Sequence, residues 1–529
     1  MSLGGDDHSI CQWSVVKPRA VEIGEPSLLP HPWTKLEGSD APRDRFAFLG
    51  QEALEGLSRR EGDTSQADLA SQARRPGSAP PRRPATPQSQ TQGYYRNQSR
   101  GVSAALQCDE ATNPAGLPAR CEDLPSLLWM APILNAGGFS SEALSYAIAL
   151  HKVYSQKKGG RFGLRQFAEQ ASSSFVNGLP SGLREQLQQM LQTGRRTDRR
   201  WDVVVCHATP DVWHRDGAFG WGKVEPCPPA PAARKSIGRA MYESDRLPES
   251  WVARINVMDQ VWVPSQFAVE QFAKSGVHRE KIAVLPEAVD VELFNPSMHE
   301  ALDLELGGLF RFVSIFKWEK RKGWDILLRA YFQEFSEADD VVLVIKTQPF
   351  HSGDDFEKKL WEEISRAQDL AGKERPARLK LLARDLQLKE LPRLYKAADA
   401  FVLPSRGEGW GRPHVEAMSM GLPVIATNWS GSTEFLWENV SLPLQIDGLE
   451  PVENGLEGHQ WAKPSEVHLR ELMRWVAEHR AEAKKLGEAA RRFMVERFSP
   501  NAVVEKHLLP LLRQRTSGAR AQRDASPEL

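Results

Sequence analysis

Short apolar runs alternate with amphipathic stretches through most of the chain. Residues 126–134 form a continuous apolar run suited to a buried parallel strand, and residues 135–154 follow as a glycine turn that opens an amphipathic helix. The order of strand, turn and helix then recurs. The further strands of this first series are predicted within residues 201–210, 259–276 and 281–296.

A second series of the same kind starts near Leu309. Its strands are predicted at 310–316, 340–347, 378–386, 400–405 and 422–427. Its helices are predicted at 324–337, in the first part of 389–411, at 412–421 and within 430–440. Strands that alternate with helices indicate parallel sheets with right-handed crossovers. The sequence therefore predicts an α/β protein with two Rossmann-like doubly wound domains that face a central cleft.

The two ends of the chain differ in composition from this α/β region. Residues 73–101 are rich in Pro, Arg, Ser, Thr and Gln and nearly devoid of aliphatic side chains. Such a segment cannot bury enough apolar surface to offset the entropy of ordering, roughly 1–2 kcal/mol per residue for the backbone alone. Residues 1–123 are therefore predicted to be a disordered N-terminal extension and residues 516–529 a disordered tail. The predicted domains between them are 124–300 and 301–495.

Charge and composition narrow the functional classes. With 68 basic and 69 acidic residues the formal net charge is −1, which argues against a protein that binds nucleic acid mainly by charge. No stretch approaches the roughly 20 apolar residues of a transmembrane helix, and the start of the chain lacks the apolar core of a signal peptide. The five cysteines are scattered, so neither a disulfide framework nor a zinc site is expected. These features predict a cytoplasmic protein with no integral membrane segment.

The densest chemical signal lies in residues 404–427. The strand at 400–405 should open at its carboxyl end on a ligand crevice. Three glycines follow closely, which lets the backbone approach a ligand and donate from its N–H groups. The next helix starts near Arg412, so its N-terminus favours a phosphate. Two carboxylates, Glu408 in the loop and Glu416 about one turn into the helix, can each accept hydrogen bonds from vicinal hydroxyls.

This string resembles the Glu-x7-Glu motif of retaining glycosyltransferases of family 4 (glycosyl transferases group 1), which have the GT-B fold. The resemblance implies that Glu408 contacts the transferred hexose and that Glu416 contacts the ribose of the nucleotide. It also implies that four loop residues lie near the sugar and phosphates: Gly409, Trp410, Gly411 and Arg412. The family commonly has a small or apolar residue where Arg412 stands, so Arg412 could supplement the phosphate site or alter the choice of donor.

A basic cluster at residues 314–325 follows a strand end and forms the second signal. Lys317 and Lys322 match positions where this family places basic residues against the donor diphosphate, although Phe316 replaces the usual glycine. As the glycosidic bond breaks, the leaving nucleoside diphosphate gains negative charge, which fixed cations stabilise. The prediction is therefore a metal-independent reaction with no cofactor besides the nucleotide-sugar donor.

Three positions in the N-terminal domain also resemble the family. Gly137 and Gly138 match its first glycine loop, near the donor phosphates or the acceptor, and His207 matches a histidine near the sugar. A histidine in the cleft can position an acceptor hydroxyl or contact the hexose. A glycine pair before a helix and a histidine after a strand are also common as purely structural features. Residues 496–515 resemble the helix that crosses back to the N-terminal domain in this fold.

These observations predict an enzyme that transfers a hexose from a nucleotide-diphosphate sugar to an acceptor hydroxyl with retention of configuration. The predicted catalytic residues are Glu408, Lys322, Lys317 and His207. An alternative is a catalytically inactive GT-B protein that binds sugars or acts as a scaffold. An NAD(P)-dependent oxidoreductase is disfavoured, because residues 136–142 lack the G-x-G-x-x-G spacing. The sequence leaves the base, the hexose and the acceptor open.

Overall fold

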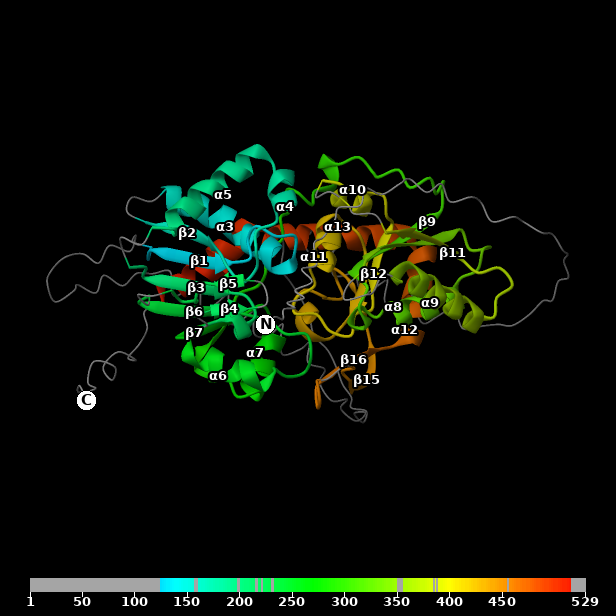
Figure 1. Cartoon of the computed structure of the whole chain (residues 1–529). Helices are drawn as coiled ribbons and strands as arrows, with labels where there is room; N and C mark the ends of the chain where they lie inside the picture. Colours follow the sequence, from blue (N-terminus) through cyan, green and yellow to red (C-terminus); the bar gives the residue numbers. More distant parts are fainter. Residues whose placement is uncertain are drawn as a thin grey trace, which may run out of the picture. The chain divides into compact units, whose positions relative to one another are not determined.

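The computed structural model describes residues 124–514, apart from 157–159, 197–199, 215–216, 220–221, 230–232, 350–354, 384–385, 387–388 and 454–455. The segments predicted to be disordered, 1–123 and 516–529, lie outside the described residues. Figure 1 shows the described chain as two α/β lobes, each built on a parallel sheet flanked by helices. This confirms the predicted fold class.

The N-terminal lobe is built on a six-stranded parallel sheet with the order β2-β1-β3-β6-β7-β8. Its strands are β1 (Leu127–Ala131), β2 (Phe162–Gln166), β3 (Val203–His207), β6 (Lys235–Arg239), β7 (Gln260–Val263) and β8 (Ile282–Val284). Its helices are α3 (Gly138–Gln156), α4 (Ser173–Gly178), α5 (Ser181–Gly194), α6 (Glu249–Val257) and α7 (Gln266–Lys274), with 3-10 turns η2 (Pro210–Val212) and η3 (Arg279–Lys281). A short antiparallel hairpin, β4 (Gly217–Phe219) and β5 (Gly222–Val224), follows η2.

Both faces of this sheet are covered, which explains why its strands read as apolar runs rather than alternating ones. On β1, Leu127 and Trp129 point to the face covered by α3, where Tyr146 packs in the same core cluster. Leu128 lies on the opposite face, in a second cluster that includes Phe272 of α7. Period-two alternation within each strand thus divides its side chains between two cores.

The C-terminal lobe has a second six-stranded parallel sheet, ordered β11-β10-β9-β12-β13-β14. Its strands are β9 (Phe310–Lys317), β10 (Val341–Gln348), β11 (Arg378–Leu382), β12 (Ala400–Leu403), β13 (Val424–Thr427) and β14 (Leu442–Leu444). Its helices are α8 (Trp324–Glu334), α9 (Phe356–Ala371), α10 (Leu391–Lys396), α11 (Arg412–Ser419), α12 (Glu466–Glu478) and α13 (Arg480–Arg497). Smaller elements are the 3-10 turns η4 (Pro296–Met298), η5 (Lys320–Lys322) and η6 (Ser430–Glu434) and the antiparallel pair β15 (Ile446–Pro451) and β16 (Gln460–Pro464).

After α13 the chain returns to the N-terminal lobe. It forms α14 (Pro500–Val503), the π-helical turn η7 (Val504–Leu508) and α15 (Leu509–Arg513). Their apolar side chains belong to the core cluster that also contains β1 and α3, and α14 contacts α3 directly. In the part of the chain that is described, no helix combines the length and the apolar character needed to cross a membrane.

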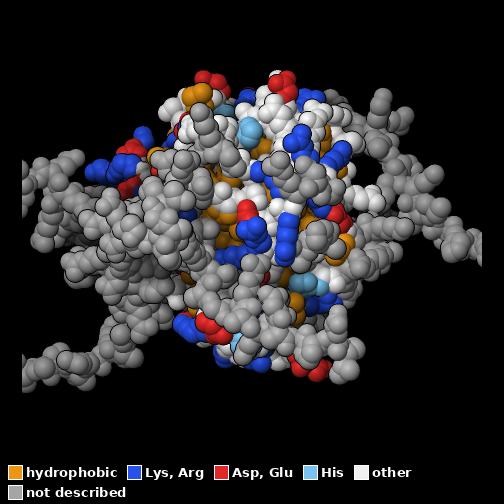
Figure 2. Space-filling view, turned by 90° about the vertical axis from the view of Figure 1, so that its left-hand side faces the viewer, with side chains coloured by type: hydrophobic (Ala, Val, Ile, Leu, Met, Phe, Trp, Pro, Cys, Tyr) orange, Lys and Arg blue, Asp and Glu red, His pale blue; other side chains and the backbone are white. Residues whose placement is uncertain are grey.

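Hydrogen bonds link the lobes outside this returning segment. The Asp245 N–H donates to the Gln460 carbonyl at 2.8 Å, and the Gln460 N–H donates to the Asp245 carboxylate at 2.7 Å. Elsewhere the Gln266 N–H donates to Glu434 at 2.9 Å. The side of the N-terminal lobe at the left of Figure 1 faces the viewer in Figure 2, where basic and acidic side chains are interspersed with apolar ones.

Two details differ from the sequence prediction. Within 430–440 the predicted helix is wrong: only the 3-10 turn η6 forms, and its first residue, Ser430, has a left-handed φ of 65° that does not continue into a helix. No disulfide was expected from the cysteine spacing, yet Cys206 and Cys227 form one. The chain after β3 brings Cys227 back beside the strand with the two Cα atoms 5.7 Å apart, which linear spacing does not reveal.

Each sheet reverses its strand order at one point, and these points locate the site. In the N-terminal sheet β1 lies between β2 and β3, and in the C-terminal sheet β9 lies between β10 and β12. In open parallel sheets, ligands bind outside the carboxyl ends of strands at such a reversal. The predicted site residues follow these strands: Gly137 after β1, Lys322 after β9 and Glu408 after β12.

Candidate functional site

A large cavity of about 2250 Å³ lies where the strand ends of the two lobes meet. It is lined by the glycine turn after β1, the segment between the lobes, the basic turn after β9, and the loop and helix after β12. Every predicted site residue except His207 lines it: Gly137, Gly138, Lys317, Lys322, Glu408, Gly409, Trp410, Gly411, Arg412 and Glu416. The structure therefore brings together residues from both lobes that lie up to 279 positions apart, from Gly137 to Glu416.

Glu408 and Lys322 form a buried ion pair at the C-terminal side of the cavity. The Lys322 Nζ donates to the Glu408 Oε1 at 2.7 Å and to Oε2 at 2.9 Å. The Ser405 Oγ donates to the same Oε1 at 2.7 Å, and Arg321 donates to Oε2 at 3.2 Å. The acidic and basic residues predicted to meet the sugar and the diphosphate are thus in direct contact with each other.

Neighbouring charged groups shift the pKa values of both Glu408 and Lys322. Burial would raise the pKa of Glu408, but Lys322 and Arg321 hold it well below its usual value, so Glu408 stays ionised. Burial and the nearby Arg321 lower the pKa of Lys322, while Glu408 opposes that change. The result is a compact group of one carboxylate and two cations at the carboxyl ends of β9 and β12.

The glycine loop after β12 has its shape because the N-terminal lobe lies against it. A Cβ on Gly407 would come within 1.9 Å of the Glu243 carbonyl oxygen, so only glycine fits there. Gly411 has a φ of 121°, a conformation that residues with a side chain rarely adopt, and it precedes α11 directly. Close approach between the lobes and the start of α11 both depend on these positions.

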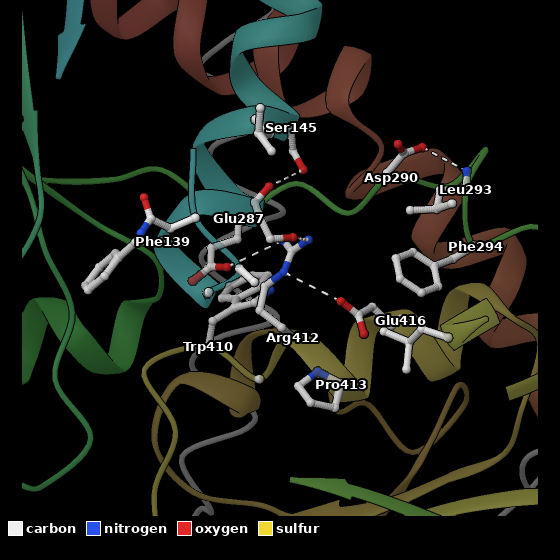
Figure 3. Close-up of a pocket in the computed structure, with 18 of the residues that line it drawn as sticks. Phe139, Ser145, Glu287, Asp290, Leu293, Phe294, Trp410, Arg412, Pro413 and Glu416 are labelled. Carbon is white, nitrogen blue, oxygen red and sulfur yellow. Dashed lines mark hydrogen bonds and ion pairs between the residues drawn. The ribbon is translucent and has the colours of Figure 1, made fainter. Parts of the chain in front are cut away.

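Arg412, the first residue of α11, extends across the cavity into the N-terminal lobe. Its Nη1 donates to the Ala288 carbonyl at 2.5 Å, and its Nη2 donates to the Ser141 Oγ at 2.8 Å. Figure 3 shows its guanidinium between Glu287, 3.6 Å away, and Glu416, 4.0 Å away. Burial raises the pKa of Glu287 well above its usual value, although Arg412 opposes this. Arg412 therefore joins the two lobes on the floor of the cavity.

Glu416 lies on α11 at the edge of the same cavity. The Tyr395 hydroxyl donates to its Oε2 at 3.1 Å. Burial raises the pKa of Glu416 to about 7, while Arg412 and the hydrogen bond from Tyr395 act in the opposite direction. This carboxyl group consequently changes its charge near neutral pH.

The other predicted residues contribute in different ways. Gly137 and Gly138 are exposed at the start of α3, with open space where a Cβ would lie. Lys317 is exposed at the end of β9 and opposes the rise that burial causes in the pKa of Glu169, which belongs to the N-terminal lobe. Trp410 borders the cavity, but its ring is almost fully buried against Phe435.

His207 is the predicted site residue that does not line the cavity. Its side chain is completely buried at the end of β3. The Trp129 Nε1 donates to its Nδ1 at 3.1 Å, and its Nε2 lies 3.0 Å from the Glu142 carboxylate, which also accepts a 2.7 Å hydrogen bond from Arg239. The contact with the sugar predicted for His207 therefore has no support in this geometry. The histidine instead belongs to a buried polar cluster with Trp129, Arg239 and Glu142, the last of which lies on α3.

Three cavity residues were missed by sequence reasoning. Arg321 stands between Lys320 and Lys322 in a run of basic residues, so the signal was present, but only Lys317 and Lys322 were predicted from it. Glu287 lies in the stretch between the two series of elements, where a single acid has no distinguishing pattern. Ser141 is one of several serines after the glycine turn, and only its contact with Arg412 singles it out.

The match to a family model lies in the C-terminal lobe. Residues 308–445 match the family model described as Glycosyl transferases group 1. The D-inositol 3-phosphate glycosyltransferase of Corynebacterium urealyticum is 30% identical over 183 residues, which are 33% of this chain and 41% of that protein. The O-antigen chain mannosyltransferase B of Escherichia coli is 37% identical over 76 residues, 14% of this chain and 20% of that protein. The chain thus spans less than half the length of these curated relatives.

Solved structures resemble both lobes together. The Anabaena protein Alr3699/HepE in complex with UDP-glucose has a TM-score of 0.50 at 17% identity, covering 73% of this chain and 99% of that one. A trehalose-6-phosphate protein from E. coli bound with UDP-2-fluoro glucose also has a TM-score of 0.50, at 11% identity, covering 74% and 99%. The chain has the GT-B fold. At these identities the likeness concerns the fold alone.

Basic and acidic side chains both line the GT-B cleft of this chain, and the basic ones include residues at the end of β9 and the start of α11. Lys317, Arg321, Lys322 and Arg412 all line it, together with the N-terminus of α11. Among the residues that the structure describes, no group of three or more His, Cys, Asp or Glu side chains is placed to hold a metal ion. Separately, the basic side chains named above and the N-terminus of α11 offer positive charge to an anionic ligand.

Proposed function

We propose that this protein is a glycosyltransferase that moves a hexose from a nucleoside-diphosphate sugar to an acceptor hydroxyl with retention of configuration. The observation that carries the proposal is the convergence of Glu408, Glu416 and the basic turn at 320–322 on one cavity of a GT-B fold. The match of residues 308–445 to Glycosyl transferases group 1 covers all of these residues and supports the same conclusion.

The proposed roles follow from charge and position. Glu408 is ionised and accepts hydrogen bonds from hexose hydroxyls, while Lys322 and Arg321 beside it face the diphosphate. Lys317 and the N-terminus of α11 add positive charge around the phosphates. Glu416 accepts hydrogen bonds from the ribose. We propose no catalytic role for His207, because it is buried away from the cavity.

In the reaction, the bond between the anomeric carbon and the diphosphate oxygen breaks, and its electron pair leaves on that oxygen. The acceptor oxygen bonds to the same face of the anomeric carbon, and its proton passes to a phosphate oxygen of the leaving group. This front-face route needs no nucleophile from the enzyme. Positive charge fixed near the diphosphate stabilises the developing anion, so we propose that the reaction needs no metal ion.

The two lobes divide the substrates in this proposal. Residues 301–495 bind the donor and residues 124–300 bind the acceptor, with 496–515 attached to the acceptor side. Two proteins of the same fold were solved with UDP-glucose or a fluorinated analogue, which makes UDP-hexoses the first donors to test. Nucleotide specificity is decided by a thermal-shift screen of UDP-, GDP- and ADP-sugars. A donor at 100 times its Kd should add about 2.7 kcal/mol of stability.

The decisive experiment measures donor turnover and product stereochemistry. The wild-type protein should hydrolyse or transfer the sugar of the donor that binds, in the presence of EDTA, and Glu408→Ala should bind it without turnover. Proton NMR of the product should show the anomeric configuration of the donor. If wild type and Glu408→Ala bind a nucleotide sugar equally and neither turns it over, the protein is a sugar-binding module instead.

A further inference from the structure

The cavity is much larger than a nucleotide sugar requires. Its volume of about 2250 Å³ exceeds the roughly 300–1,000 Å³ of a typical small-molecule site. The proposed donor residues lie on the C-terminal side, at the ends of β9 and β12. The remaining space extends into the N-terminal lobe, where residues of α3, α4 and α5 line it. This second region is open to another molecule.

One face of α3 forms the first wall of this region. The lining residues Ser141, Leu144, Ile148, Lys152 and Ser155 follow one another at spacings of three or four, so they lie along one side of the helix. From Ser141 to Ser155 this face extends about 21 Å at 1.5 Å per residue. Ser141 is also the residue that Arg412 reaches, which fixes the donor end of the wall.

A second group of lining residues comes from α4, α5 and the turn between them. Phe175, Leu179 and Leu183 line the cavity there, and Phe175 and Leu183 are only partly buried against the core. Together with Leu144 and Ile148 of α3 they make up what we call the apolar arm. On α3 the polar lining residues lie towards the two ends, with serines at the donor end and His151, Lys152 and Ser155 at the far end. The lining near α4 and α5 also includes Ser172, Ser174 and Gln186.

The chemistry of the arm selects its occupant. A second sugar would place hydroxyl groups against Leu, Ile and Phe side chains, which cannot hydrogen-bond to them, and leaving such groups unpaired is costly. A hydrocarbon chain has no such requirement and gains from burial. The arm is also continuous with the site where the acceptor hydroxyl must meet the donor. We propose that the arm binds the hydrocarbon chain of an amphiphilic acceptor. This inference rests on the proposed function and adds a class of acceptor to it.

The arm predicts a bounded chain-length effect. Its apolar portion runs from Leu144 to Lys152, about 12 Å along α3. Isothermal titration of the full chain with n-alkyl glucosides of increasing length, below their micelle concentrations, should show Kd falling about four-fold per added methylene. The gain should level off once the chain passes Lys152. Free glucose should bind too weakly to measure.

Matched variants assign the effect to the arm. Leu183→Glu should abolish the dependence of Kd on chain length. Ile148→Gln should raise Kd for the longest alkyl glucoside by at least ten-fold. The control is Leu370→Glu, which changes a 63% exposed leucine on α9 and should leave every Kd as in wild type. Thermal unfolding of each variant tests whether a loss of binding reflects a loss of folding.

UDP-glucose binding, measured on the same samples, separates this inference from the proposed function. If UDP-glucose or another nucleotide sugar binds but Kd for alkyl glucosides is independent of chain length, the inference is overturned and the proposed function stands. If chain-length dependence is present and lost in Leu183→Glu while no nucleotide sugar binds, the arm is real and the proposed function fails. An equal effect of Leu370→Glu and Leu183→Glu would also overturn the inference.

Discussion

At the scale of single residues, the contact between Glu408 and Lys322 has consequences for stability as well as for function. Both side chains are buried, and each neutralises the other across 2.7 Å. Removing one partner leaves an uncompensated buried charge, which costs more than removing both. Any loss of activity in variants at these positions therefore has to be read beside their stability.

Glu408→Gln should lower kcat by roughly 100-fold or more, because a neutral amide cannot hold the sugar and the adjacent cations as the carboxylate does. It should also lower the free energy of unfolding by about 3 kcal/mol. The double variant Glu408→Gln with Lys322→Met should be more stable than either single variant and still inactive. Urea unfolding and donor turnover, measured in parallel, check both parts. A double variant that loses the sum of the two single effects would contradict the pairing.

Glu416 gives the site a pH dependence near neutrality. Its pKa is raised by burial to about 7, and the ionised form is the better acceptor for ribose hydroxyls. Nucleotide Kd should therefore be constant above pH 7 and rise about ten-fold for each pH unit below it. Calorimetric titration with UDP between pH 5.5 and pH 8.5 measures this, and Glu416→Gln should give a flat profile.

The same shift affects stability with the opposite sign. Because the folded-state pKa of Glu416 lies above the usual value of 4.5, the folded state binds this proton more tightly than the unfolded state. The contribution is fully present below about pH 4.5 and is lost as the pH rises through about 7. Glu434, whose pKa burial also raises to about 7, contributes in the same direction. Nucleotide affinity should therefore rise with pH while this contribution to stability falls. If nucleotide affinity instead falls with rising pH, Glu416 has no role in binding.

At the scale of secondary-structure elements, the returning C-terminal segment is a structural part of the N-terminal lobe. Leu508, in the π-helical turn η7, is completely buried in the cluster that contains β1 and α3. Leu508→Ala should lower the free energy of unfolding by about 2–5 kcal/mol, because it removes buried methyl groups and leaves a cavity. Leu370→Ala, at an exposed position, should change it by less than about 0.5 kcal/mol. Equal effects in urea unfolding would show that the segment is not packed there.

Element positions were largely predictable from the sequence, and the exceptions have identifiable causes. The strands β1, β3, β9, β10 and β12 are runs of mostly apolar residues, because both faces of each sheet are covered, so their pattern stands out. The edge strands β2 and β14 were not predicted, because β2 carries Arg165 and Gln166 and β14 has only three residues, one of them proline. The predicted helix within 430–440 failed at Ser430, where tight packing of Gly431 against Gly409 holds the chain in a turn.

At the scale of the whole molecule, Arg412 connects α11 to the opposite lobe. Its hydrogen bonds to Ala288 and Ser141 cross the cleft, and its side chain is mostly buried. Arg412→Leu should cost about 1–3 kcal/mol of unfolding free energy, because buried acceptors lose a charged donor. It should also raise Kd for nucleotide sugars, since the lobes are less firmly joined. Guanidinium unfolding and donor titration measure the two effects.

The control for Arg412 is an arginine whose ion pair is local and exposed. Arg366 on α9 pairs with Glu363 one turn away, and its side chain is 64% exposed. Arg366→Leu should change stability by no more than about 1 kcal/mol and leave donor Kd unchanged. If Arg412→Leu behaves like Arg366→Leu, the contact across the cleft contributes little to joining the lobes.

The sequence by itself determined the two parallel sheets and the strand ends that carry the site. Apolar runs, glycine turns and helix starts are local features, so neighbouring residues in the sequence are enough to predict them. Parallel sheets then gather their carboxyl ends at one edge, which is why residues chosen after β1, β9 and β12 converged on one cavity.

Only the tertiary structure decided which partner each of these side chains has. His207 was predicted in the cleft, but Trp129 and Glu142 hold it behind α3. Arg412 was predicted to supplement the phosphate site or to alter the choice of donor, and the structure adds hydrogen bonds from it to the other lobe. The pairing of Cys206 with Cys227 and the apolar arm between α3 and α5 likewise depend on packing. Such contacts join residues far apart in the chain, and no local pattern encodes the direction in which a side chain finds its partner.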